Sequence, residues 1–90
     1  MENKILVITT KGCESCYKLD KLINEALSIT KKEVEYIKQD VSEVDKNFIK
    51  QHKIEDFPTT FLIKNGIIKF KFTGTRPAIV IARWIDVQLQ

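Results

Sequence analysis

The sequence predicts an α/β fold in which a four-stranded mixed sheet is flanked by three helices, in the order β-α-β-α-β-β-α. Three observations carry this prediction. Residues 5–8 form a continuous apolar run, which is typical of a strand buried on both faces. Residues 14–30 repeat apolar side chains at helical spacing. Asn65-Gly66 separates two apolar runs, which is a strong signal for a β-hairpin.

The first half of the chain supplies two of the strands and two of the helices. After the first strand, residues 9–12 are expected to form a loop, and Gly12 permits a sharp turn into the helix over residues 14–30. Apolar residues between 34 and 37 indicate a second strand that ends near Asp40. The capping pattern Ser42-Glu43-Val44-Asp45 then predicts the start of a short helix that ends near residue 51.

The second half supplies the hairpin and the last helix. Residues 61–63 are expected to form the third strand and residues 67–72 the return strand. A helix is expected over residues 75–89, with Pro77 in its first turn. Two helical crossovers would make the first three strands parallel, and the hairpin would add an antiparallel strand. Helices should then cover both faces of one domain spanning residues 1–90.

Composition indicates an ordinary globular protein. The chain is 43% hydrophobic and 30% charged, with a net charge of +3 that is scattered rather than clustered, so we expect no nucleic-acid binding. The first apolar run is too short for a signal peptide or a membrane span, and we therefore expect a cytoplasmic protein with no membrane contact. A monomer is expected, although the apolar stretch over residues 78–82 leaves self-association open. His52 is expected to be a solvated surface residue.

Cys13 and Cys16 are the only cysteines and share the first turn of the expected helix. At this spacing their β-carbons lie about 5–6 Å apart, and a small adjustment brings them to the roughly 3.8 Å of a disulfide. Closing so short a loop stabilises little by chain entropy, so a redox role is favoured over a structural one. The helix N-terminus lowers the pKa of the Cys13 thiol, which makes it the nucleophile, and Cys16 the less exposed resolving thiol.

Three neighbours are expected to tune the Cys13 thiol. Lys11 would favour the thiolate by its positive charge, and Glu14 would oppose it by its negative charge. Ser15 could donate a hydrogen bond to the thiolate.

The position of the cysteine pair, between the first strand and the first helix, combines with later motifs into a resemblance. Phe57-Pro58-Thr59 precedes a strand, Lys64-Asn65-Gly66 forms the hairpin turn, and Gly74 precedes the last helix. Over essentially its whole length the chain resembles the thioredoxin/glutaredoxin family, which implies a thioredoxin-like fold. The resemblance implies that Pro58 is cis and packs beside the cysteines. The backbone of Phe57 would then lie beside Cys13, with Gly12 and Gly74 lining the same substrate groove.

The chain departs from both branches of that family. Gly12 stands where typical thioredoxins have Trp, and Glu14-Ser15 stands where they have Gly-Pro. No Asp or Glu between Asn3 and Gly12 supplies the buried acid of thioredoxins. Asp56-Phe57 stands where typical glutaredoxins have Thr-Val.

The resemblance implies a small dithiol–disulfide oxidoreductase that reduces protein disulfides. Its partners would be client proteins and an unidentified reductase, and it would need no cofactor or metal beyond the redox-active Cys13–Cys16 disulfide. Three alternatives stay open. A glutaredoxin-like enzyme would act on glutathione mixed disulfides. A copper chaperone would hold Cu(I) between the two thiolates. A thioredoxin-like scaffold would not use the thiols at all.

Overall fold

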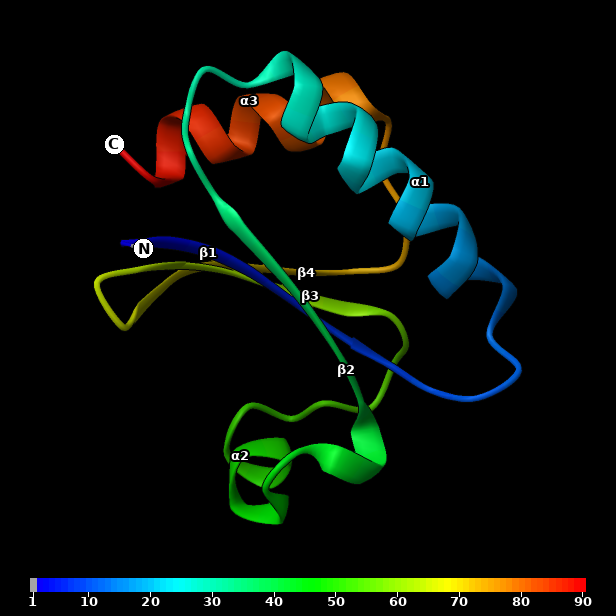
Figure 1. Cartoon of the computed structure of the whole chain (residues 1–90). Helices are drawn as coiled ribbons and strands as arrows, with labels where there is room; N and C mark the ends of the chain where they lie inside the picture. The colour runs from blue at the N-terminus through cyan, green and yellow to red at the C-terminus, as the bar shows by residue number, and fades with distance from the viewer. Residues whose placement is uncertain (1) are drawn as a thin grey trace.

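The computed structural model describes residues 2–90 and contains the expected sequence of elements (Figure 1). In chain order these are β1 (Asn3–Thr9), α1 (Glu14–Ile29), β2 (Glu35–Asp40), the 3₁₀ helix η1 (Val41–Glu43), α2 (Lys46–Gln51), β3 (Thr59–Lys64), β4 (Ile67–Thr73) and α3 (Ala78–Gln88). The expected α/β architecture of a four-stranded mixed sheet with three helices is thus confirmed.

The strand order in the sheet is β2-β1-β3-β4. β1 pairs with β2 in parallel, whereas β3 pairs with both β1 and β4 in antiparallel fashion. The expectation that the first three strands are parallel is therefore wrong for β3. A parallel β3 would require the chain to return along a strand of about 20 Å. The six residues of α2 rise only about 9 Å, and β3 instead starts opposite Ile8, at the end of the sheet where β2 finishes.

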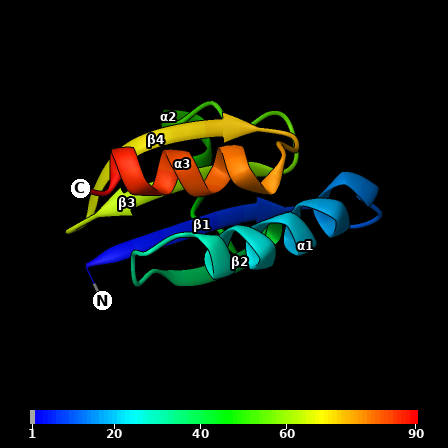
Figure 2. The same ribbon diagram turned by 90° about the horizontal axis from the view of Figure 1, so that it is seen from above.

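The helices cover both faces of the sheet, as expected. Figures 1 and 2 show α1 and α3 side by side on one face, with α2 on the opposite face. Two apolar cores fill these layers. The core under α1 and α3 is centred on Ile5, Leu19, Ile23, Leu62, Ile81 and Ile85. The smaller core under α2 is built on Ile8, Ile54 and Phe61.

The helix starts differ from expectation. The side chain of Asp40 caps η1 in a capping box with Glu43, and the side chain of Asp45 caps α2. The expected single helix from Ser42 is therefore two short helices, each capped by an aspartate. α3 begins at Ala78, with Pro77 as its N-cap rather than inside its first turn. Gly74 turns the chain at a φ of +76°, and a residue before proline disfavours helical backbone, so Arg76 cannot begin the helix.

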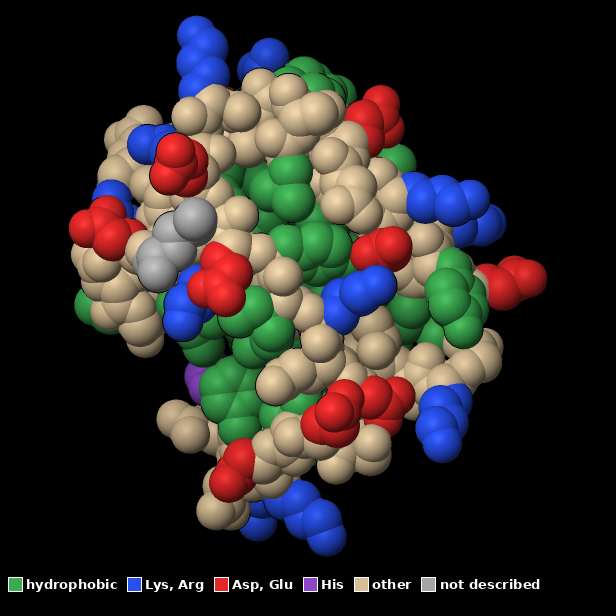
Figure 3. Space-filling view, in the orientation of Figure 1, with side chains coloured by type: hydrophobic (Ala, Val, Ile, Leu, Met, Phe, Trp, Pro, Cys, Tyr) green, Lys and Arg blue, Asp and Glu red, His purple; other side chains and the backbone are tan. Residues whose placement is uncertain are grey.

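His52 is not the solvated residue that the sequence suggested. It is partly buried, and its ring lies 4.3 Å from that of Phe48 and 5.6 Å from that of Phe61. The surface is otherwise mixed, since Figure 3 shows charged side chains of both signs spread over this face with apolar side chains between them. Within residues 2–90, no helix is both long and apolar enough to span a membrane.

Candidate active site

Cys13 occupies the capping position at the start of α1. The chain leaves β1 and turns through Gly12, whose φ of +69° favours a residue without a side chain. Cys13 then adopts extended backbone, and its sulfur accepts a hydrogen bond of 3.1 Å from the backbone N–H of Cys16. A sulfur atom thus does here what a Ser or Asp oxygen usually does at a helix N-cap. The sulfur therefore faces the positive end of the helix dipole.

The two cysteines form a disulfide, and their Cα atoms are 5.3 Å apart. This separation lies in the ordinary range for a protein disulfide. The two residues differ in accessibility, because Cys13 is partly exposed whereas Cys16 is only 7% exposed. Of the two residues, Cys13 is therefore the more accessible to a large molecule.

A second segment, far away in sequence, reaches the same place. The peptide bond between Phe57 and Pro58 is cis, and Pro58 is buried. The hydroxyl of Ser15 lies 3.4 Å from the carbonyl oxygen of Phe57 and donates to it, which joins the start of α1 to the start of β3. The backbone N–H of Gly74 donates to the carbonyl oxygen of Pro58 at 2.9 Å. The structure therefore gathers Gly74, Pro58, Phe57 and the cysteine turn at one end of the sheet.

The neighbours expected to tune Cys13 lie in different surroundings. Ser15 is partly buried, with its hydroxyl oxygen 3.3 Å from the sulfur of Cys13. Glu14 and Lys11 are exposed. The pKa of Asp40 is lowered, first by hydrogen bonds from Ser42 and more weakly by the charge of Lys11. Lys11 therefore also interacts electrostatically with Asp40 at the end of β2.

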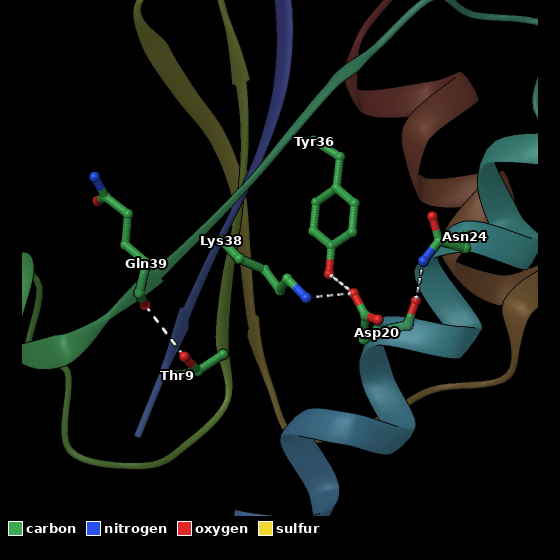
Figure 4. Close-up of polar contacts among 6 residues, drawn as sticks. All are labelled: Thr9, Asp20, Asn24, Tyr36, Lys38 and Gln39. Atoms are coloured by element: carbon green, nitrogen blue, oxygen red, sulfur yellow. Dashed lines mark hydrogen bonds and ion pairs between the residues drawn. The ribbon is translucent and has the colours of Figure 1, made fainter. Parts of the chain in front are cut away.

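A polar cluster that lies beside the cysteines was not predicted from the sequence. Asp20 on α1 accepts a hydrogen bond of 2.7 Å from the hydroxyl of Tyr36 and forms an ion pair of 3.1 Å with Lys38 (Figure 4). The hydrogen bond from Tyr36 is the main cause of the lowered pKa of Asp20. The pKa of Tyr36 is raised, mainly by burial and then by its bond to Asp20.

This cluster borders the redox pair through a shared depression. A surface depression of about 250 Å³ is lined by Cys16 and Asp20 of α1, by Lys38 of β2 and by the exposed Tyr17. The available signals were the four-residue spacing from Cys16 to Asp20, which puts both on one helix face, and the alternation of Tyr36 and Lys38 along a strand. A carboxylate of α1 therefore lies in the same depression as Cys16, whereas β1 supplies none.

Chemically, the site offers a partly exposed cysteine at a helix N-terminus, a buried cysteine bonded to it, and a backbone carbonyl that Ser15 connects to the same turn. Within residues 2–90, no three His, Cys, Asp or Glu side chains gather closely enough to hold a metal ion. Thiol–disulfide exchange needs only the two sulfurs, one of them reachable as a thiolate. The arrangement meets that requirement.

Comparisons with known proteins agree with this geometry. The sequence model of the Thioredoxin family matches residues 2–87. A thioredoxin-2, described as a component of the malaria parasite protein secretion machinery, superimposes with a TM-score of 0.78 at 15% identity, over 93% of this chain and 81% of that chain. A structure described only as a malarial protein gives a TM-score of 0.79 at 16% identity, with all of both chains covered. At these identities the solved structures establish the fold alone. No curated protein sequence matches the chain.

Proposed function

The chain belongs to the thioredoxin family, and on that premise we propose that it reduces disulfide bonds in client proteins through the Cys13–Cys16 pair. The observation that supports the proposal is the unequal exposure of the two cysteine residues, which form one disulfide at the start of α1. An accessible cysteine bonded to a buried one matches the order of events in dithiol exchange.

The proposed reaction has two exchange steps. The thiolate of Cys13 attacks a client disulfide, which forms a mixed disulfide and releases one client sulfur as a thiolate. The thiolate of Cys16 then attacks the sulfur of Cys13, which closes the Cys13–Cys16 bond and releases the second client sulfur. The client disulfide gains two electrons and two protons and becomes two thiols. The Cys13–Cys16 dithiol loses two electrons and two protons and becomes a disulfide. A separate reductase would restore the dithiol.

The helix start supports the nucleophile assignment. In the oxidised protein the sulfur of Cys13 already accepts the N–H of Cys16. After reduction, the same N–H and the helix dipole would stabilise negative charge on that sulfur and lower its pKa. Burial of Cys16 disfavours its own thiolate, so Cys16 is proposed to react only within the mixed disulfide.

The client is proposed to bind as an extended segment across Gly12, Phe57, Pro58 and Gly74. The bond between Gly74 and Pro58 holds these two loops together next to the cysteines. Neither glycine carries a side chain that would narrow the surface, and a Cβ atom at Gly12 would have no neighbour within 4 Å. Backbone groups at such a surface can pair with an added strand.

The first experiment is a redox titration of the purified protein in glutathione buffers, with free thiols counted by alkylation and intact mass. A reversible intramolecular disulfide with a potential of about −200 to −290 mV would support a reductant suited to the cytoplasm. A value of about −120 to −180 mV would point to an oxidant or isomerase instead. If no disulfide forms in any buffer, the proposal is wrong and metal binding or a scaffold role replaces it.

The two cysteines should fail in different ways when replaced. Cys16→Ser should accumulate mixed disulfides with clients, because the resolving thiol is missing. Cys13→Ser should lose all reduction of insulin disulfides, and full activity in this variant would refute the assignment. If Cys16→Ser keeps its activity on a glutathionylated peptide, the protein acts as a glutaredoxin-like enzyme on glutathione mixed disulfides.

A further inference from the structure

The hydroxyl of Ser15 lies between two acceptors that belong to the two halves of the site. Its oxygen is 3.3 Å from the sulfur of Cys13 and 3.4 Å from the carbonyl oxygen of Phe57. Among residues 2–90, Ser15 is the only group that donates to this carbonyl. Phe57 is partly exposed, and its backbone belongs to the segment across which the proposed client would bind.

The hydroxyl has one proton for these two acceptors. In the oxidised protein the sulfur of Cys13 is part of a disulfide, which is a weak acceptor. The hydroxyl of Ser15 therefore donates its hydrogen bond to the carbonyl oxygen of Phe57. In the reduced protein a thiolate on Cys13 would carry a full negative charge, and hydrogen bonds to charged acceptors are about twice as strong as those between neutral groups. Because the two distances are nearly equal, rotation about the Cβ–Oγ bond redirects the proton without any movement of heavy atoms.

We propose that Ser15 is a positioning residue whose hydroxyl donates its hydrogen bond to the Phe57 carbonyl in the oxidised protein and to the Cys13 thiolate in the reduced protein. This inference rests on the proposed function for its use, since the carbonyl released by Ser15 would accept a backbone N–H of the client. The reduced form would then bind an extended client more tightly than the oxidised form. Once the Cys13–Cys16 bond closes, the hydroxyl again donates to Phe57 and occupies one of the two lone pairs of that oxygen, which weakens the bond that a client N–H makes there.

The same contact links client binding to the reactivity of the thiol. By thermodynamic reciprocity, a client N–H that donates to the Phe57 carbonyl favours the state in which the Ser15 hydroxyl donates its hydrogen bond to the sulfur of Cys13. That hydrogen bond stabilises the Cys13 thiolate. One neutral hydrogen bond corresponds to a difference of about three- to tenfold in affinity between the two forms. A tenfold difference would raise the reduction potential by about 30 mV at saturating client.

The hydrogen bond from Ser15 to Phe57 can be observed without any client. Phe57-Pro58 is the only Phe-Pro pair in the sequence, so labelling with carbonyl-¹³C phenylalanine and ¹⁵N proline marks one peptide bond. The ¹³C resonance of Phe57 should move upfield when the oxidised protein is reduced at a pH above the pKa of Cys13, because the carbonyl loses its donor. In the reduced protein this resonance should titrate with the same midpoint as the ultraviolet absorbance of the Cys13 thiolate.

Ser15→Ala is the test variant and Ser28→Ala, on the exposed face of the same helix, is its matched control. Ser15→Ala should abolish the redox-dependent movement of the Phe57 resonance and raise the pKa of Cys13 by about one unit. Ser28→Ala should leave both unchanged. A Phe57 resonance that moves equally in Ser15→Ala and wild type, or an unchanged Cys13 pKa in Ser15→Ala, would overturn the proposal. If the wild-type protein does not reduce insulin disulfides, the proposed function is refuted. The ¹³C resonance of Phe57 would still report on the hydrogen bond of Ser15.

Discussion

Thr59 and Thr60 offer a paired test of how hydrogen bonding decides the stability of a buried threonine. Both residues are 0% exposed and lie next to each other at the start of β3. The hydroxyl of Thr59 donates to the carbonyl oxygen of Asp56 at 2.6 Å. The hydroxyl of Thr60 has no hydrogen-bond partner within residues 2–90, and its neighbours across the sheet are the apolar Val7 and Phe72. The same substitution by valine should therefore have opposite effects at the two positions.

Valine keeps the shape and the β-branching of threonine, so strand propensity changes little. At Thr60 it removes a buried polar group that costs about 1–3 kcal/mol when unpaired, and we expect Thr60→Val to stabilise the fold by about 1–2 kcal/mol. At Thr59 it breaks an existing bond, and we expect Thr59→Val to destabilise the fold by about 0.5–1.5 kcal/mol. For a domain of this size, each kcal/mol shifts the melting temperature by about 4–8 °C.

Urea denaturation of the oxidised proteins measures both changes, provided that the dependence of the free energy of unfolding on urea is the same in all three. The two variants should lie on opposite sides of the wild type and differ by about 1.5–3.5 kcal/mol. If Thr60→Val loses as much stability as Thr59→Val, the reasoning is refuted, because the hydroxyl of Thr60 must then have a partner such as a buried water molecule.

Four further predictions concern the polar cluster, the hairpin and the cysteine turn. Burial raises the pKa of Tyr36, so stability present below about pH 10 should be lost as the pH rises further, and Tyr36→Phe should reduce this loss in urea titrations at alkaline pH. The lowered pKa of Asp20 works in the opposite sense: its contribution, present above its unfolded pKa, should disappear as acid protonates the folded group, and should shrink in Tyr36→Phe. Gly66→Ala should cost about 1 kcal/mol by urea denaturation, because φ is +78° there although the added Cβ meets nothing within 4 Å; no loss would contradict the turn geometry. Glu14→Gln should lower the pKa of the Cys13 thiol, followed by thiolate absorbance, and high salt should erase the difference between the two proteins.

Local patterns predicted much of the fold. The apolar run of β1, the helical spacing of α1 and the Asn65-Gly66 turn each depend on neighbours close in sequence, and each is confirmed. The direction of β3 was not predictable in the same way. It depends on how far the chain between Asp40 and Thr59 travels, and capping by Asp40 and Asp45 splits that segment into two helices too short to carry it back.

In the candidate site, too, features set by local sequence were predictable, whereas features set by contacts between distant segments were not. Cys13 and Cys16 were evident from their own spacing, and the resemblance indicated Pro58 and Gly74. The contact between Ser15 and the carbonyl oxygen of Phe57 joins residues 42 positions apart, and no periodicity within either segment signals it. The bonds of Asp20 to Tyr36 and Lys38 likewise require α1 to pack over the side of the sheet that holds β2 (Figure 4).

The antiparallel pairing of β1 with β3 has a consequence for which client disulfides the proposed activity would favour. The turn that carries Cys13 extends from β1, and the segment that carries Pro58 leads into β3, so both halves of the site are anchored in the two central strands. Central strands are the last to open in local unfolding, whereas edges and termini open first. Anchoring in these two strands favours a rigid site, so we expect the conformational adjustment needed for docking to fall on the partner. We expect disulfides in mobile loops to be reduced in preference to equally exposed disulfides held between rigid elements.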